Sequence, residues 1–308
     1  MKRLLVALFV AMLMVGFGPA ISAEEPVRTW TDLKGRKMEA SFVQFADDKV
    51  IIRRDDGVSF NVSPAIFSEE DRKYLAELSQ KLNLTEEVEP DTPVTFKDSK
   101  LEAAVRKELK KPDDSALTHK DLAMLESLKA GQGGITSLAG LEHATNLSKL
   151  MLWNNQITEV KPLANLTKLT SLNLSLNQIT EVTSLTNLTS LTRLNLTRNK
   201  ISKLAPLTGL TKLTNLELAH NQITDAAPLA NLTNLALLDI SSNKISDVMP
   251  LAKLTKLDTL DLGFNPIADV TPLTNLSSLT LLLLGNSSIT DAQKAIFKKA
   301  LPKCKILF

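Results

Sequence analysis

The chain has 308 residues, of which 44% are hydrophobic and 23% charged, so it carries enough apolar material for a packed protein and too much for a disordered one. Its 36 basic and 34 acidic side chains nearly cancel, which leaves no electrostatic footprint for nucleic acid or an anionic membrane surface. A single cysteine, Cys304, excludes an intrachain disulfide framework, and three histidines (His119, His143 and His220) offer little acid–base chemistry at neutral pH. Composition therefore argues against an enzyme, and we expect no cofactor.

Residues 1–23 have the pattern of a secretory signal peptide. The cations Lys2 and Arg3 begin it, an apolar stretch continues to about Phe17, and a run of small residues ends at Ala23. The apolar stretch is shorter than the ~20 residues that cross a bilayer, so cleavage is favoured over a membrane anchor. We expect the mature protein to be secreted or to lie in the periplasm or cell envelope, without stable insertion in the membrane.

Residues 24–80 predict a small β-rich domain, because aromatic residues concentrate there. Three short β-prone runs lie at residues 38–43, 49–53 and 59–62. Turn signals rich in Asp and Gly separate them at 47–48 and 55–57. Ser68 then supplies a helix N-cap, and Tyr74, Leu75 and Leu78 recur at helical spacing, so we expect a short helix to close a compact barrel or meander.

Several motifs of this segment resemble the Sla-type homology domain, an SH3-like barrel. They are Trp30-Thr31-Asp32, Gly35-Arg36, Ala40-Ser41-Phe42, Asp56-Gly57 and the run from Ser68 to Leu75. In eukaryotic endocytic adaptors this family binds short peptides, so the resemblance implies a peptide-binding module. A barrel that serves as a spacer or a dimer contact is the alternative.

Residues 81–95 predict an extended acidic linker. Acidic residues and two prolines, Pro90 and Pro93, replace the apolar periodicity of the preceding segment. The linker separates the small domain from everything that follows.

The pattern Leu-x-Leu-x-x-Asn-x-Ile then recurs with a constant step of 22 residues. Its asparagines are Asn155, Asn177, Asn199, Asn221, Asn243 and Asn265. A degenerate copy precedes the array at Leu128, and another follows at Leu282, where Ser287 replaces the asparagine. Loss of the consensus at both ends is expected of a solenoid.

This repeat resembles the 22-residue leucine-rich repeat of the internalin class, over roughly residues 96–308. The other half of each unit carries a leucine that is usually preceded by proline, as in Pro162-Leu163, which favours a 3₁₀ turn over a long helix. We therefore expect an α/β leucine-rich repeat solenoid with a parallel β-sheet on its concave face, a 3₁₀ or irregular convex face and helical caps. The small β-barrel domain precedes it.

Stacking explains what the repeated residues do. One repeat cannot bury its leucine face alone, whereas stacked strands form one continuous core. Each asparagine lies just past a strand, where its amide can donate to and accept from backbone groups of the turn. We therefore assign the asparagine ladder a structural role.

We expect caps to close both ends of this core. The N-terminal cap is predicted at 96–134, the repeats at 135–289 and the C-terminal cap at 290–308. At the N-terminal end one helix begins near Asp98, and a second has a Thr118/Asp121 capping box and continues through Leu128. At the C-terminal end a helix begins after Thr290, and a last strand follows it.

Residues between the leucines of each strand point to the concave side, in three columns that a ligand can touch. The candidate binding residues are Met151, Trp153, Asn173, Arg193, Asn195, Arg198, Glu217, His220, Asp239, Asp261 and Phe264. Charge is divided along them, with Lys149, Arg193 and Arg198 toward the start and the carboxylates toward the end. Trp153 is the best candidate for a binding hot spot, and the alternative is a packed aromatic on an ordinary solvated face.

Glu217, Asp239 and Asp261 form an acidic column, because the 22-residue step places them on adjacent strands about 4.8 Å apart. Like charges directly opposite one another are destabilising. A raised carboxylate pKa, a bound cation such as Ca²⁺, or a Lys or Arg side chain from a partner can relieve the repulsion. Solvent screening alone is the alternative, and we favour the cationic partner group.

The search for other chemistry yields no catalytic or metal-binding set. Gly131 to Gly134 lack the Lys-Ser/Thr of a phosphate loop, and no histidine has a partner at a recognisable triad or ligand spacing. The sequence therefore predicts an exported, non-enzymatic protein that binds a protein or peptide on its concave face. A cell-wall or polysaccharide binder is one alternative, and an exported hydrolase that uses Glu217 and Asp239 is another.

Overall fold

The computed structural model describes residues 27–46, 49–54, 59–85, 92–285 and 289–308. The chain separates into two compact units, Met1–Val88 and Glu89–Phe308. The expected signal peptide, the turn signals at 47–48 and 55–57, the acidic stretch at 86–91 and Ser287 lie outside the described residues.

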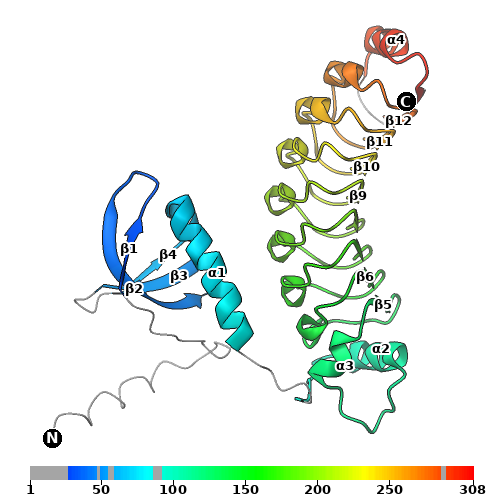
Figure 1. Cartoon of the computed structure of the whole chain (residues 1–308). Helices are drawn as coiled ribbons and strands as arrows, with labels where there is room; N and C mark the ends of the chain where they lie inside the picture. The colour runs from blue at the N-terminus through cyan, green and yellow to red at the C-terminus, as the bar shows by residue number, and fades with distance from the viewer. Residues whose placement is uncertain (1–26, 47–48, 55–58, 86–91, 286–288) are drawn as a thin grey trace, which may run out of the picture. The chain divides into compact units, whose positions relative to one another are not determined.

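The first unit contains a four-stranded antiparallel sheet of order β1-β2-β3-β4 (Figure 1). Its strands are β1 (Arg28–Thr31), β2 (Lys37–Ala46), β3 (Lys49–Arg53) and β4 (Ser59–Val62). The sequence did not predict β1, because that strand has four residues and only one of them, Trp30, is buried. Trp30 is 1% exposed, and its indole Nε1 donates to the carbonyl of Ala40 at 2.9 Å. This ring therefore ties β1 to the core.

A 3₁₀ turn, η1 (Pro64–Ile66), and the helix α1 (Glu69–Thr85) complete the first unit. Asp71 fastens the helix to β1, because its carboxylate accepts from the Thr31 N–H at 2.7 Å and pairs with Arg28 at 2.8 Å. The Arg28 guanidinium also lies 3.7 Å from the centre of the Tyr74 ring. We expected a short helix that ends by residue 80, but α1 has 17 residues. No proline or glycine interrupts residues 81–85, so the helix runs into the segment predicted as linker.

The second unit is the predicted solenoid. Nine parallel strands form one sheet in chain order, from β5 to β13. They are β5 (Ser127–Lys129), β6 (Lys149–Met151), β7 (Ser171–Asn173), β8 (Arg193–Asn195), β9 (Asn215–Glu217), β10 (Leu237–Asp239), β11 (Thr259–Asp261), β12 (Leu281–Leu283) and β13 (Lys305–Leu307). The middle residue of each strand from β5 to β12 is a buried leucine, and the flanking residues point the other way. The strands lie on the concave side of the array (Figure 1).

Short 3₁₀ turns form the opposite side of the solenoid, which confirms the predicted convex wall. They are η2 (Leu141–His143), η3 (Lys161–Leu163), η4 (Thr183–Leu185), η5 (Ala205–Leu207), η6 (Ala227–Leu229), η7 (Met249–Lys253) and η8 (Thr271–Asn275). Five of these described turns carry proline at their first or second position. Proline fits there because the first N–H groups of a helical turn have no internal partner. Each turn buries one leucine against the strand layer.

The asparagine ladder hydrogen-bonds the backbone of neighbouring repeats. In the middle of the array, Asn199 Nδ2 donates to the carbonyls of Leu174 and Leu196, both at 3.0 Å. Its Oδ1 accepts from the Ile179 N–H at 3.0 Å. The other five asparagines make the same set of bonds, and each is buried. Each amide therefore joins two successive repeats at the point where the strands end.

Both ends of the leucine core are covered. At the N-terminal end, α2 (Ser99–Leu109) begins at Asp98, whose carboxylate also accepts from the Thr136 N–H at 2.7 Å in the first repeat. The helix α3 (His119–Ala123) has the predicted Thr118/Asp121 capping box, but it ends after one turn and does not reach Leu128. Leu128 lies instead in β5, which confirms the degenerate copy of the repeat at this residue, and pairing with β6 satisfies the backbone of that segment.

At the C-terminal end, the helix α4 (Asp291–Ala300) begins at Thr290, and β13 extends the sheet. Thr290 and Gln293 form a capping box. The helix and the strand both occur where the sequence predicted them.

We expect Asn199→Ala to lower the free energy of unfolding by about 1 to 3 kcal/mol, because it leaves buried backbone groups of two repeats without partners. Asn187→Ala is the matched control, since Asn187 is exposed in the neighbouring repeat. Urea unfolding of both variants measures the difference. Equal midpoints for the two variants would contradict the proposed role of the ladder.

Candidate functional site

The concave face is built around a central column of side chains that the strand register aligns. Its members are Lys129, Met151, Asn173, Asn195, Glu217, Asp239, Asp261, Leu283 and Leu307. Sequence reasoning did not include Lys129 and Leu307, because the strands that carry them lack the asparagine consensus. The parallel pairing of β12 with β13 is the observation that adds Leu307.

Most polar members of the central column are held in place by the backbone. Asn173, Asp239 and Asp261 each accept, through Oδ1, the N–H of the residue two positions later, at 2.9, 3.0 and 2.9 Å. Asn195 does the same for Thr197. These N–H groups lie where the strand turns away, so a short side-chain acceptor is needed there. These hydrogen bonds therefore fix the orientation of the four side chains.

Glu217 is bonded differently, because its side chain is one carbon longer. Its Oε2 accepts from Asn195 Nδ2 on the adjacent strand at 2.8 Å. Burial raises the pKa of Glu217, and the negative charge of Asp239 raises it further. Burial also raises the pKa of Asp261. The hydrogen bond from the Gly263 N–H lowers this pKa, and the negative charge of Asp239 raises it. A raised carboxylate pKa, one of the three expected forms of relief, is therefore present in the acidic column.

No ion pair within the described part of the chain involves Glu217, Asp239 or Asp261. Arg193 and Arg198 are exposed and lie toward the N-terminal half of the face. The two arginines therefore lie N-terminal to the three carboxylates on this face, and Lys305 lies beyond the carboxylates, in the last strand.

A second column lies two positions after the central one, at Trp153, Ser175, Thr197, Ala219, Ser241, Gly263 and Gly285. Fewer of its residues are accessible than we expected, because several are buried. Ser175, Ala219 and Gly263 are covered where the strand bends into the turn. Thr197, Ser241 and Gly285 are half-buried, and Trp153 is exposed, with 37% of its surface accessible. One face of its indole packs on Gly131, where an added Cβ would lie 2.5 Å from Cε2 of the ring. Trp153 is thus an oriented aromatic with one side open to solvent.

A third column lies one position further along each turn, directly before the ladder asparagine, and its residues adopt a left-handed backbone conformation. Six of them have φ between 52° and 57°, namely Asn154, Leu176, Arg198, His220, Ser242 and Phe264. Asn tolerates this region, whereas Leu and Phe rarely occupy it. Phe264 is nonetheless 62% exposed. The pattern of hydrophobicity carries no sign of this conformation, which the turn after each strand imposes.

A pocket of about 300 Å³ lies at the C-terminal end of the concave face, and we call it the concave pocket. Its lining residues are His220, Ser241, Ser242, Asp261, Gly263, Phe264, Leu283, Gly285, Leu307 and Phe308. The structure therefore brings together three of the sequence candidates, His220, Asp261 and Phe264. It adds Leu307 and Phe308, which hydrophobic patterning did not distinguish from core residues of a last strand.

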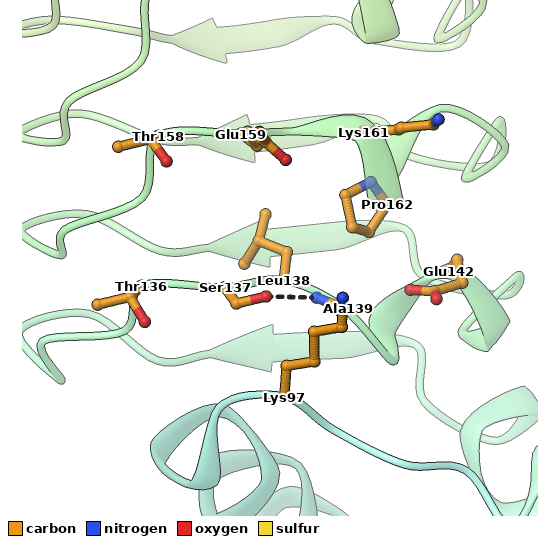
Figure 2. A pocket seen from close by; sticks show the side chains of 10 residues that line it. All are labelled: Lys97, Thr136, Ser137, Leu138, Ala139, Glu142, Thr158, Glu159, Lys161 and Pro162. Carbon is orange, nitrogen blue, oxygen red and sulfur yellow. Dashed lines mark hydrogen bonds between the residues drawn. The ribbon is translucent and has the colours of Figure 1, made fainter. Parts of the chain in front are cut away.

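A second pocket, of about 460 Å³, lies beside the first two repeats and is shown in Figure 2. Its lining residues are Lys97, Thr136, Ser137, Leu138, Ala139, Glu142, Thr158, Glu159, Lys161 and Pro162. Several of its polar groups are engaged with the chain itself, since Ser137 Oγ accepts from the Ala139 N–H and Glu142 accepts from the Gly140 N–H. None of the sequence candidates lies in this pocket.

Other reactive side chains are dispersed. Across the described ranges, no three His, Cys, Asp or Glu side chains form a group that could hold a metal ion. His119 and His143 stack in the N-terminal cap with ring centroids 4.0 Å apart. Burial raises the pKa of the Cys304 thiol, which disfavours the thiolate. Within these same ranges, no helix combines the length and the apolar character needed to cross a membrane.

Comparisons with known proteins agree with this architecture. Residues 21–82 match the SLA1 homology domain 1 family, and windows between residues 145 and 275 match the family of leucine-rich repeats. The chain is 34% identical to an internalin (inlF) from Listeria monocytogenes, over 70% of this chain and 71% of that one, with a TM-score of 0.64. It is 38% identical to internalin C2 of the same organism, over 71% and 99% of the two chains, with a TM-score of 0.66.

A leucine-rich repeat protein from Leptospira interrogans is 31% identical over 61% of this chain and 50% of its own, with a TM-score of 0.54. No curated protein matches the chain.

We expect Glu217→Gln to stabilise the protein at neutral pH, and the gain to shrink as the pH falls. The raised pKa means that the folded state binds this proton more tightly than the unfolded state does, so ionised Glu217 costs stability at pH 7. The cost disappears as the pH falls through the folded pKa toward the ordinary value of 4.5. Denaturant unfolding at pH 7 and pH 4 measures the change in the free energy of unfolding that Glu217→Gln causes. Glu181→Gln, at an exposed position, is the control for the loss of one negative charge. A gain independent of pH would refute the account.

We also expect acrylamide to quench part of the tryptophan fluorescence and leave part protected, because Trp153 is exposed and Trp30 is buried. Trp153→Phe should remove the component that acrylamide reaches. If that variant quenches as readily as the parent, then Trp153 is not the accessible indole.

Proposed function

The chain belongs to the internalin family of leucine-rich repeat proteins, and on this premise we propose that it is a non-enzymatic interaction protein whose concave face binds a protein or peptide. The observation that carries the proposal is the rigid central column. Four of its polar side chains, Asn173, Asn195, Asp239 and Asp261, are held by backbone N–H groups, so binding a partner costs little ordering of this surface.

The shape and composition of the face support a macromolecular partner. The central column extends across nine strands, and its three carboxylates lie C-terminal to Arg193 and Arg198 on the same face. Such a division favours one orientation of an extended or folded partner over the reverse. Trp153 offers an aromatic contact near the first repeat, and Phe264 offers one near the last.

We further propose that the protein is exported after cleavage within residues 1–23, as the pattern of that segment indicates. The SLA1 homology domain is proposed as a second peptide-binding module, separate from the repeats. The hydrolase alternative has little support, because neither Glu217 nor Asp239 lines the concave pocket.

A site-specific cross-linking experiment tests the proposal. A photoreactive amino acid at position 193, on the concave face, should capture a protein from the native envelope or its surroundings. The same group at position 249, an exposed site on the 3₁₀ turn η7, should not capture it. The captured protein is then purified, and its affinity for the parent and for Trp153→Ala is measured. We expect the Trp153 variant to bind more weakly, by about tenfold or more for a hot spot.

Equal capture from both positions would refute a concave binding face. Retention of the full chain on insoluble cell-wall polysaccharide, with no captured protein, would instead favour the alternative of a polysaccharide binder.

A further inference from the structure

We propose that the concave pocket holds the side chain of an arginine from the partner. The inference rests on the proposed function, since it names the chemical group that one end of the concave face recognises. It depends on three features of the pocket, namely an uncompensated carboxylate, an exposed aromatic wall and an open floor.

The carboxylate is that of Asp261. One of its oxygens, Oδ1, accepts from the Gly263 N–H at 2.9 Å, and within the described residues no hydrogen bond reaches Oδ2. Asp239 lies directly beside it on the next strand and adds negative charge. Burial and this neighbour both raise the pKa of Asp261. An incoming cation would therefore gain a free acceptor and relieve a repulsion that the strand register imposes.

The wall of the pocket is apolar and open to solvent. Phe264 is 62% exposed and Phe308 is 43% exposed, and both line the same pocket. Lys294 Nζ already lies 5.4 Å from the centre of the Phe308 ring, so Phe264 is the ring that would receive an incoming cation. Exposed rings attract a cation placed over their faces, and the apolar surface suits the methylene groups of a long basic side chain. Phe264 is also held at a φ of 57°, where asparagine would fit with less strain. The turn of each repeat imposes this φ, so the conformation is not special to Phe264, but the choice of a large ring at that position is not required by the fold.

Two glycines keep the floor of the pocket clear. Apart from its chain neighbours, an added Cβ at Gly285 would meet no atom of the described residues within 4 Å, and one at Gly263 would approach Asp261 Oδ1 at 3.2 Å. The volume of about 300 Å³ is small for a drug-sized ligand. These dimensions favour a single side chain that projects from a larger partner.

Arginine fits these features better than the other cations. Calcium takes six to eight oxygen ligands, and the described part of the chain holds no cluster of acidic side chains that could supply them. A guanidinium group is planar, so it can stack on the Phe264 ring and donate to the Asp261 carboxylate at once. A lysine ammonium is compact and more strongly hydrated, and would use only part of the aromatic wall.

The test uses the full chain and a synthetic probe, the acetylated and amidated peptide Gly-Arg-Gly-Arg-Gly-Arg-Gly. Versions with lysine or with citrulline, the neutral isostere of arginine, provide the controls. Binding is followed by NMR through the backbone amides of Gly263 and Gly285. We expect the arginine peptide to bind at least tenfold more tightly than the citrulline peptide and measurably more tightly than the lysine peptide, with weaker binding at high salt.

Three variants locate the site. Asp261→Asn should weaken binding of the arginine peptide at least tenfold, whereas Glu181→Gln, an exposed carboxylate outside the pocket, should leave it unchanged. Gly285→Leu should block binding, because the new side chain would enter the open floor. Phe264→Asn should weaken binding severalfold without lowering the melting temperature, since asparagine tolerates the left-handed conformation. That last variant separates loss of the ring from loss of the fold.

The proposal is overturned if the citrulline peptide binds as tightly as the arginine peptide, or if Asp261→Asn binds like the parent. Equal affinity for the lysine peptide would overturn the choice of arginine. These outcomes are independent of the cross-linking result. If a partner is captured at position 193 but the pocket shows no preference for arginine, the proposed function stands and this inference is rejected. If the pocket prefers arginine but positions 193 and 249 capture equally, the pocket stands and the proposed concave binding face is rejected.

Discussion

Each repeat pairs with its neighbours through a strand of only three residues, so no repeat is stable without the next. The register is fixed because the middle leucine of every strand must be buried, and a shift by one residue would expose the whole column of leucines. The asparagine ladder completes the constraint. Each amide bonds to its own repeat and to the preceding one, so the turn after every strand has the same shape. The caps follow from the same requirement, because the first and last repeats leave one side of the leucine core without a neighbour.

The N-terminal cap shows how a local motif and the array share one residue. Asp98 caps α2 and also accepts from Thr136 in the first repeat. Burial alone would raise its pKa, but the hydrogen bonds, led by those from Thr136, outweigh burial and lower it. The stability that Asp98 contributes is therefore present at neutral pH and is lost as the pH falls through its lowered folded pKa. The pKa of Glu217 is raised, so its ionised form costs stability at neutral pH and that cost is lost in acid. At low pH the attachment of the cap through Asp98 therefore weakens, while the charge repulsion on the concave face decreases.

Most of the solenoid could be predicted because its signal is periodic. Leucines, prolines and asparagines at a constant step determine which residues form strands, turns and the ladder. The misses occur where local and tertiary preferences compete. Leu128 continues a helical spacing, yet sheet pairing places it in β5. The α1 helix runs past residue 80 because only the later proline-rich stretch opposes it. At the candidate site, the columns could be assigned from the step alone. The side-chain bonds to the following N–H groups, the left-handed turn residues and the contribution of Phe308 depend on backbone geometry, which periodicity does not encode.

The ladder also explains how the concave face can vary without loss of the fold. The residue before each ladder asparagine is left-handed, and holding Leu or Phe there costs on the order of 1 kcal/mol or more. The adjacent asparagine makes three backbone hydrogen bonds that keep the turn in this conformation whatever the preceding side chain is. Folding therefore constrains the asparagine strictly and its exposed neighbour only weakly. Of the six left-handed positions, Asn154 holds the residue type that the conformation favours, whereas Phe264 holds a large exposed ring. The fold does not require that ring. Its presence with Asp261 in the concave pocket is therefore best explained by the partner group that the pocket is proposed to hold.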